Sequence, residues 1–229
     1  MPRHPAGNRL SQPRCSAPPG TGRTHPQPEE VPLDIAGSIR AALVEAQAAL
    51  QALCEDADTL AALERAGLAL ADTFRRGGRV FSCGNGGSMC DAMHFAEELS
   101  GRFRDDRDPL PAAAISDPGH LSCVGNDYGY AQVFSRYIAA HARAGDALLA
   151  ISTSGRSENV LQAARTARER GVLVIAMTGQ RNSPLSELAG IELATPAGRY
   201  ADRVQELHIK MIHILIELTE RQLFPASYR

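Results

Sequence analysis

The sequence predicts an α/β fold, a three-layer sandwich in which a five-stranded parallel sheet lies between helices. Short apolar runs alternate with helix-length segments, as expected for parallel strands joined by crossover helices. The composition, 44% hydrophobic and 22% charged over 229 residues, fits one globular domain with a substantial core. The predicted strands lie at 79–83, 111–115, 147–152, 172–178 and 191–195.

Three longer segments have the periodicity of amphipathic helices. Residues 35–53 and 58–76 place apolar side chains at intervals of three and four, and Gly77-Gly78 ends the second segment. A last helix is expected from Ala201 to Leu223. The first two helices are rich in alanine and leucine, so we expect residues 34–76 to pack on the sheet domain or on partner subunits.

The first 33 residues differ from the rest of the chain. They hold eight of its 14 prolines and four arginines, with almost no periodic apolar pattern. Such a segment buries too little surface to offset its ordering entropy, so residues 1–33 are predicted to be a disordered tail before a single domain at 34–229. Its arginines faintly suggest a targeting peptide, but without a hydrophobic or amphipathic stretch a dispensable tail is favoured.

Charge and cysteine usage limit the classes of function. A net charge of −2 gives no electrostatic reason to expect nucleic-acid binding. No run approaches the ~18 apolar residues of a membrane-spanning helix, so no membrane partner is expected. The five cysteines lack CxxC spacing, which favours reduced thiols in a cytoplasmic protein. Cys83 is read as a buried thiol rather than a nucleophile.

The segments that follow two of the predicted strands have the composition of an oxyanion-binding site. Gly84 to Ser88 follows the first predicted strand, and Ser152 to Asn159 ("STSGRSEN") follows the third. In open parallel sheets, ligands bind at the carboxyl ends of strands, where glycines and helix N-termini suit phosphate. Neither loop is a Walker loop or a clean GxGxxG, so a compact phosphomonoester is favoured over a nucleotide. In the alternative interpretation the serines merely cap helices and the glycines make turns.

A histidine and a carboxylate follow the first loop on one predicted helix face. His94 and Glu98 are four residues apart, which makes them a candidate metal or acid–base pair. Glu97 points elsewhere and is expected to be solvated or structural.

On the last helix, Gln205, His208 and His213 stand among apolar residues, and their polar groups need partners. Gln205 and His213 are about 12 Å apart along a helix, an awkward span for one metal. Either long side chains converge between them or the site draws on more than one subunit, and we favour a site near a subunit interface. The alternative is a histidine bound to a backbone carbonyl.

Five segments together resemble a known family. They read "SCGNGGSMCDAMHFAEELSGRFR", "AISD", "CVGNDYGYAQVFSRY", "GDALLAISTSGRSENVLQAA" and "YADRVQELHIKMIHILIEL". They are similar to the phosphoheptose isomerases, which have the flavodoxin-like SIS (sugar isomerase) fold, over about residues 35–225. The resemblance implies a homotetramer that converts D-sedoheptulose 7-phosphate to D-glycero-D-manno-heptose 7-phosphate. The product would feed nucleotide-activated heptose synthesis for lipopolysaccharide, other surface polysaccharide or secondary metabolites.

The resemblance also implies the site residues. Zinc, one ion per subunit where the family binds it, would be held by His94, Glu98, Gln205 and His213. Glu98 and His213 would also be the catalytic acid–base pair, and which role dominates for Glu98 is open. The phosphate would be bound by Ser152, Thr153, Ser154 and Ser157. The full set of expected substrate contacts is Asn85, Gly86, Gly87, Ser88, Glu98, Asn126, Asp127, Ser152, Thr153, Ser154, Ser157 and Gln205.

Two positions depart from the family pattern. Met89 stands where the family often has a polar residue, and Arg156 stands where it often has asparagine. Neither is a proposed catalytic position.

Two other functions compete with the isomerase. A non-catalytic branch of the same fold associates with the bacterial replication initiator, but it lacks equivalents of Glu98 and His213. The "RQLFP" ending is reminiscent of that branch. A sugar-phosphate sensor would usually carry a helix-turn-helix, which the N-terminal tail does not offer.

Overall fold

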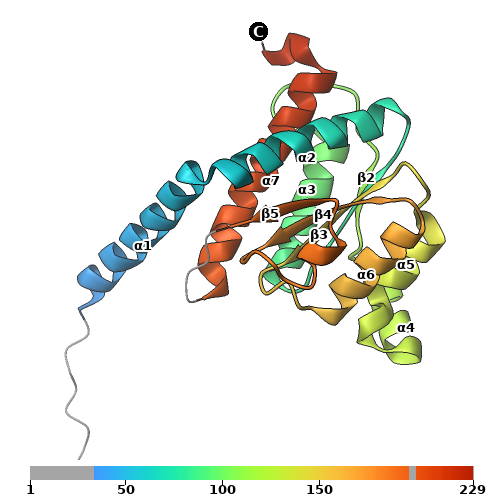
Figure 1. Cartoon of the computed structure of the whole chain (residues 1–229), viewed down its shortest axis with the longest axis horizontal. Coiled ribbons are helices and arrows are strands. Elements are labelled where there is room, and N and C mark those ends of the chain that lie inside the picture. The colour runs from blue at the N-terminus through green and yellow to red at the C-terminus, as the bar shows by residue number, and fades with distance from the viewer. Residues whose placement is uncertain (1–33, 196–199, 229) are drawn as a thin grey trace, which may run out of the picture. The chain divides into compact units, whose positions relative to one another are not determined.

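The computed structural model describes residues 34–195 and 200–228, and residues 36–229 group into one compact unit. The predicted tail at 1–33 lies outside the described residues. A five-stranded sheet forms the centre of the unit (Figure 1). Its strands are β1 (Val80–Cys83), β2 (Ala112–Ala114), β3 (Ala147–Ser152), β4 (Leu173–Thr178) and β5 (Ile191–Ala194).

All strand pairs are parallel, in the order β2-β1-β3-β4-β5. The five predicted strands are confirmed to within one residue at each end. Because β1 lies between β2 and β3, the connections leave it in opposite directions. Ligands of open α/β sheets bind outside the carboxyl ends of strands at such a switch point.

Residues 34–195 and 200–228 form seven α-helices, and they include the three that the periodicity predicted. They are α1 (Ile35–Glu55), α2 (Ala57–Arg75), α3 (Gly87–Ser100), α4 (Pro118–Tyr128), α5 (Val133–His141), α6 (Glu158–Glu169) and α7 (Ala201–Leu223). Short 3-10 turns lie at 130–132, 186–188 and 225–228. Figure 1 shows α2, α3 and α7 on one side of the sheet and α4, α5 and α6 on the other.

Each face of the sheet has its own apolar core, which confirms the three-layer prediction. On one face, Phe95 of α3 and Met211 of α7 pack with strand side chains such as Leu149. On the other, Phe134 of α5 packs with strand side chains such as Leu148. Successive side chains of a strand point to opposite faces, so each central strand supplies both cores.

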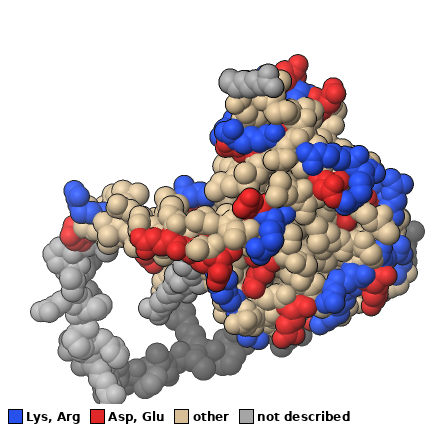
Figure 2. All heavy atoms as spheres, turned by 45° about the horizontal axis from the view of Figure 1, so that its top comes forward, with Lys and Arg blue, Asp and Glu red and all other residues tan. Residues whose placement is uncertain are grey.

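The helix α1 exposes an apolar stripe. Ile39 and Leu43, four residues apart and therefore on one face, are 59% and 67% exposed. Acidic and basic side chains are interspersed on the face shown in Figure 2. None of the helices within residues 34–195 and 200–228 is long and apolar enough to cross a membrane.

His208 of α7 is fully buried. Burial lowers the pKa of its imidazole to about 4, against a smaller opposing contribution from the backbone of Thr178 at the end of β4. The alternative interpretation expected a histidine bound to a backbone carbonyl, but neither ring nitrogen of the buried His208 has a hydrogen-bond partner among the described residues. It takes no part in the cluster of metal-ligand type described below.

The burial of His208 predicts a loss of stability in mild acid. In the unfolded chain the imidazole of His208 binds a proton near pH 6.5, whereas in the folded chain it does so only near pH 4. Stability that is present above pH 6.5 is therefore lost as the pH falls. We expect this group to lower the free energy of unfolding by about 2 kcal/mol between pH 7 and pH 5. Urea denaturation of the wild type and of His208→Met, both with chelator present, measures it. Identical pH dependences of the two proteins would contradict the prediction.

Candidate active site

Two loops meet at the carboxyl edge of the sheet. The first joins β1 to α3, the second joins β3 to α6, and the two strands are hydrogen-bonded neighbours. Two amide–amide hydrogen bonds connect the loops: Asn85 donates to Asn159 over 2.9 Å, and Asn159 donates back over 2.8 Å. The hydroxyl of Tyr130 donates to the same Asn85 oxygen over 3.2 Å. The two predicted phosphate loops therefore form one surface.

The N-termini of α3 and α6 lack side-chain caps. Gly86 precedes α3 and Ser157 precedes α6, and neither makes a side-chain capping bond. The Ser157 hydroxyl instead accepts from the hydroxyl of Ser152 over 3.1 Å. The interpretation of these serines as ordinary helix caps is therefore wrong for Ser157. Uncapped helix N-termini leave backbone N–H groups to bind an anion.

Close packing at the start of α3 explains its glycines. Gly86 has a φ of 55°, in the left-handed region that favours glycine. A Cβ at Gly87 would lie 2.5 Å from the side-chain amide nitrogen of Gln205. The amide of Gln205 therefore packs against the first residue of α3.

A cluster of three side chains lies further along α3. Donor atoms of His94, Glu98 and His213 all lie within 4.8 Å of one another. The Nε2 atoms of the two histidines are 2.9 Å apart, and His94 Nε2 is 3.5 Å from a Glu98 carboxylate oxygen. The predicted pairing of His94 with Glu98 is confirmed, and the fold brings His213 to them from α7. Two imidazoles and a carboxylate are the ligand set of many catalytic zinc sites.

The surroundings shift the proton affinities of this triad. Burial raises the pKa of Glu98, and the charges of Glu97 and Glu220 raise it further, against lowering by His94 and Arg107. Burial lowers the pKa of His213, as do the charges of His94 and two nearby cations. The raised pKa of Glu98 moves toward neutral pH, where general bases work best, and the lowered pKa of His213 favours a neutral imidazole that can accept a proton.

Other predicted residues lie at varying distances from this triad. The amide of Gln205, on α7, packs against Gly87, which lies about 10 Å of helix rise before His94 on α3, and Gln205 stays a predicted ligand. Asn126 and Asp127 are exposed at the end of α4, where the amide of Asn126 donates to Asp127 over 2.8 Å. They and the remaining substrate contacts stay predictions.

Two expectations about single residues have clear outcomes. Glu97 is 66% exposed, as expected, yet its carboxylate lies 3.2 Å from His94 Nδ1, so it does not point away from the site. Cys83 is buried, and burial raises the pKa of its thiol to about 12, which supports the structural thiol over a nucleophile.

The sequence interpretation missed three polar residues near the site. Asn159 and Tyr130 connect the loops, although both lie within segments that the family resemblance had already singled out. Asp91 precedes His94 by one turn of α3, and burial raises the pKa of its carboxyl group to about 6. The spacing of three residues between Asp91 and His94 could have indicated Asp91 from the sequence, whereas only spatial proximity marks Asn159 and Tyr130.

Comparison with known proteins defines the class of protein first. Residues 44–179 match the SIS domain family. Solved phosphoheptose isomerases from Neisseria gonorrhoeae and Francisella tularensis have the same fold, with TM-scores of 0.75 and 0.74 at 35% and 34% identity. These likenesses cover 81% and 80% of this chain, and 98% of each solved chain. The chain is an SIS-domain protein.

Sequence similarity narrows the class to a particular family. The phosphoheptose isomerase of Tolumonas auensis is 54% identical over 185 residues, covering 81% of this chain and 96% of that protein. That of Yersinia enterocolitica is 53% identical over 188 residues, covering 82% and 97%. The chain belongs to the phosphoheptose isomerase family.

Proposed function

We propose that this chain isomerises D-sedoheptulose 7-phosphate to D-glycero-D-manno-heptose 7-phosphate. The single observation that carries the proposal is the triad that His213 of α7 forms with His94 and Glu98 of α3, the helix that starts at the first phosphate loop. His94 follows Gly87 by about 10 Å along α3. A heptose 7-phosphate carries its phosphate and its reacting carbons at opposite ends, which matches this separation. The names of the relatives support the same substrate.

The reaction moves one proton between adjacent carbons. In the proposed mechanism the Glu98 carboxylate removes a proton from C1 of the ketose, and the C1–H electron pair forms the enediol double bond. Glu98 then returns the proton to C2, which produces the aldose. His213 moves a proton between the oxygens on C1 and C2. A raised pKa makes the Glu98 carboxylate a stronger base than an ordinary carboxylate, which favours removal of the C1 proton.

The triad also fits a divalent metal ion. His94, Glu98 and His213 supply two imidazole nitrogens and a carboxylate oxygen, and we propose that they hold zinc, with Gln205 as a further ligand. Zinc polarises a carbonyl group and stabilises the charge of an enediolate. The lowered pKa of His213 keeps its imidazole neutral, the form in which it binds a metal.

We further propose a cytoplasmic homotetramer with sites near subunit interfaces. The exposed apolar side chains of α1, among them Ile39, Leu43 and Val44, support burial against another copy of the chain. The triad is partly open to solvent, with the side chains of His94 and Glu98 35% and 17% exposed, which is consistent with a partner that completes the site.

The proposal is tested by turnover of sedoheptulose 7-phosphate by the purified protein. We expect turnover that falls at least tenfold after chelation and returns when zinc is added, because a bound metal would stabilise the developing negative charge. Formation of the aldose is followed by NMR. If metal-replete protein binds the sugar phosphate without converting it, the chain is instead a non-catalytic phosphosugar-binding protein.

A further inference from the structure

A buried cationic side chain lies beyond the triad, in the segment that follows α3. The side chains of Arg107 and of Glu220, on α7, are each 3% exposed and form an ion pair with 2.7 Å between Nε and Oε1. The hydroxyl of Tyr228 donates to the other Glu220 oxygen over 2.6 Å. We call these three residues the Arg107 clamp. A charge pair this deeply buried is expensive unless its geometry is well satisfied.

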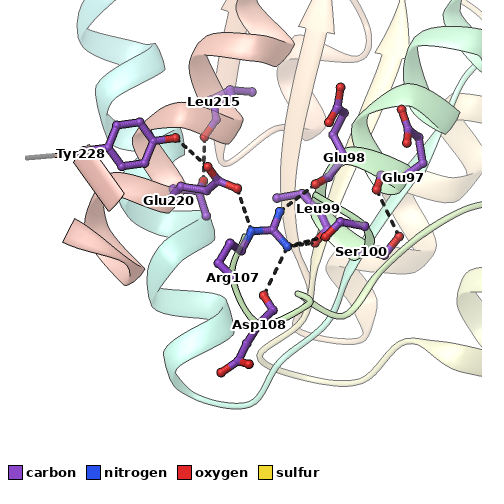
Figure 3. Close-up of polar contacts among 11 residues, drawn as sticks. Glu97, Glu98, Leu99, Ser100, Arg107, Asp108, Leu215, Glu220 and Tyr228 are labelled. Carbon is purple, nitrogen blue, oxygen red and sulfur yellow. Dashed lines mark hydrogen bonds and ion pairs between the residues drawn. The ribbon is translucent and has the colours of Figure 1, made fainter. Parts of the chain in front are cut away.

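The rest of the guanidinium binds the end of α3. Nη2 donates to the backbone carbonyl of Glu98 over 2.7 Å, and Nη1 donates to those of Leu99 and Gly101 over 2.8 and 2.9 Å. Figure 3 shows the guanidinium between Glu220 and the end of α3 at Glu98 and Leu99, with the Glu98 side chain directed away from it. The last four carbonyls of a helix lack intrahelical partners, so Arg107 acts as the C-terminal cap of α3.

The clamp joins the two helices that carry the triad. Glu98 lies in the last turn of α3, where helices fray, and its own carbonyl is one that Arg107 binds. Glu220 follows His213 by seven residues, so both lie on the same face of α7. Phe103, in the same connecting segment as Arg107, packs beside His213 with ring centroids 5.8 Å apart. The connecting segment thus touches α7 both at the triad and two turns beyond it.

We propose that Arg107 is a positioning residue that holds the Glu98 backbone at the end of α3 in fixed register with His213 of α7. The inference rests on the proposed function, since it concerns the geometry of the same triad. A displacement of about 1 Å in a reacting group costs on the order of 100-fold in rate. The phosphate loops lie at the other end of α3, so substrate affinity depends little on the clamp.

The first test is Arg107→Lys. A lysine keeps a positive charge opposite Glu220 but lacks the planar fork that reaches both Glu220 and the carbonyls of α3. We expect kcat for sedoheptulose 7-phosphate to fall at least tenfold while KM stays within threefold. We also expect the dissociation constant for Co²⁺, followed by its visible absorption, to rise at least tenfold.

A second variant separates positioning from stability. Arg107→Met combined with Glu220→Leu removes the whole pair, and such apolar replacements often preserve folding. We expect the same losses of kcat and Co²⁺ affinity from this double variant. The control is Asp146→Asn. The buried carboxylate of Asp146 accepts a hydrogen bond from the backbone N–H of Arg79 over 2.8 Å, at the amino ends of the strands and away from the triad, and the substitution removes its charge. It is expected to lower the melting temperature and leave both activity and Co²⁺ affinity unchanged.

The outcomes distinguish the clamp from the proposed function. A folded Arg107→Lys protein with kcat and Co²⁺ affinity within twofold of the wild type would overturn the clamp. Equal losses in Asp146→Asn would also overturn it, since general destabilisation would then explain them. If the wild type does not convert the substrate, the proposed function fails. The Co²⁺ titrations alone then test whether Arg107 positions Glu98. A wild type that neither converts substrate nor binds Co²⁺ would overturn both.

Discussion

Replacing Glu98 by glutamine is expected to lower kcat for sedoheptulose 7-phosphate by about 10³-fold or more. The substitution keeps the shape of a side chain that is only 17% exposed and removes the carboxylate that takes the C1 proton. General base catalysis of this kind contributes about 10²- to 10⁴-fold. The loss is measured by steady-state kinetics with saturating zinc.

Metal content and a matched variant complete this experiment. If Glu98→Gln retains its zinc and loses turnover, the proton-transfer role of Glu98 dominates over its role as a ligand. The control is Glu169→Gln, an exposed carboxylate at the end of α6, and its activity should equal that of the wild type. Turnover by Glu98→Gln within tenfold of the wild type would exclude Glu98 as the base.

The second large effect is expected from the double substitution Ser154→Ala and Ser157→Ala. A hydrogen bond to a charged group contributes about 1.5–3 kcal/mol, so losing two hydroxyls from the phosphate should lower kcat/KM by about 100-fold or more. Most of the loss should appear in KM, because the phosphate is bound alike in the ground state and in the transition state. Steady-state kinetics measures the division between kcat and KM.

A hydroxyl at the opposite edge of the sheet provides the comparison. Thr73 of α2 donates to the carbonyl of Ala69 within its own helix, so Thr73→Val removes a buried hydroxyl away from both loops. We expect this variant to change stability and leave KM unchanged. An unchanged KM in the serine double variant would show that the backbone N–H groups of α3 and α6, without these hydroxyls, bind the phosphate.

The strands and the longest helices followed from sequence because their signals are local. The run "ALLAIS" coincides with β3, and the last helix spans Ala201–Leu223 as its periodicity predicted. Apolar side chains recurring with the period of a helix, or in short buried runs, depend on neighbours a few residues away. The pairing of His94 with Glu98 is local in the same way, since residues four apart share a helix face.

Contacts between distant segments required the tertiary structure. His213 lies 119 residues beyond His94, and only the packing of α7 beside α3 brings their nitrogens to 2.9 Å. The link from Asn85 to Asn159 depends likewise on the pairing of β1 with β3. On the last helix, periodicity does not distinguish a core side chain such as His208 from a member of the triad such as His213.

The sequence by itself determined the α/β class, the two loops and the identity of the catalytic candidates. The tertiary structure decided which of them act together, and it revealed Arg107 as the cap of α3. The physical reason is that hydrophobic periodicity depends on residues that are close in sequence. A buried arginine instead depends for its hydrogen bonds on carbonyls and carboxylates that the folded elements bring to it.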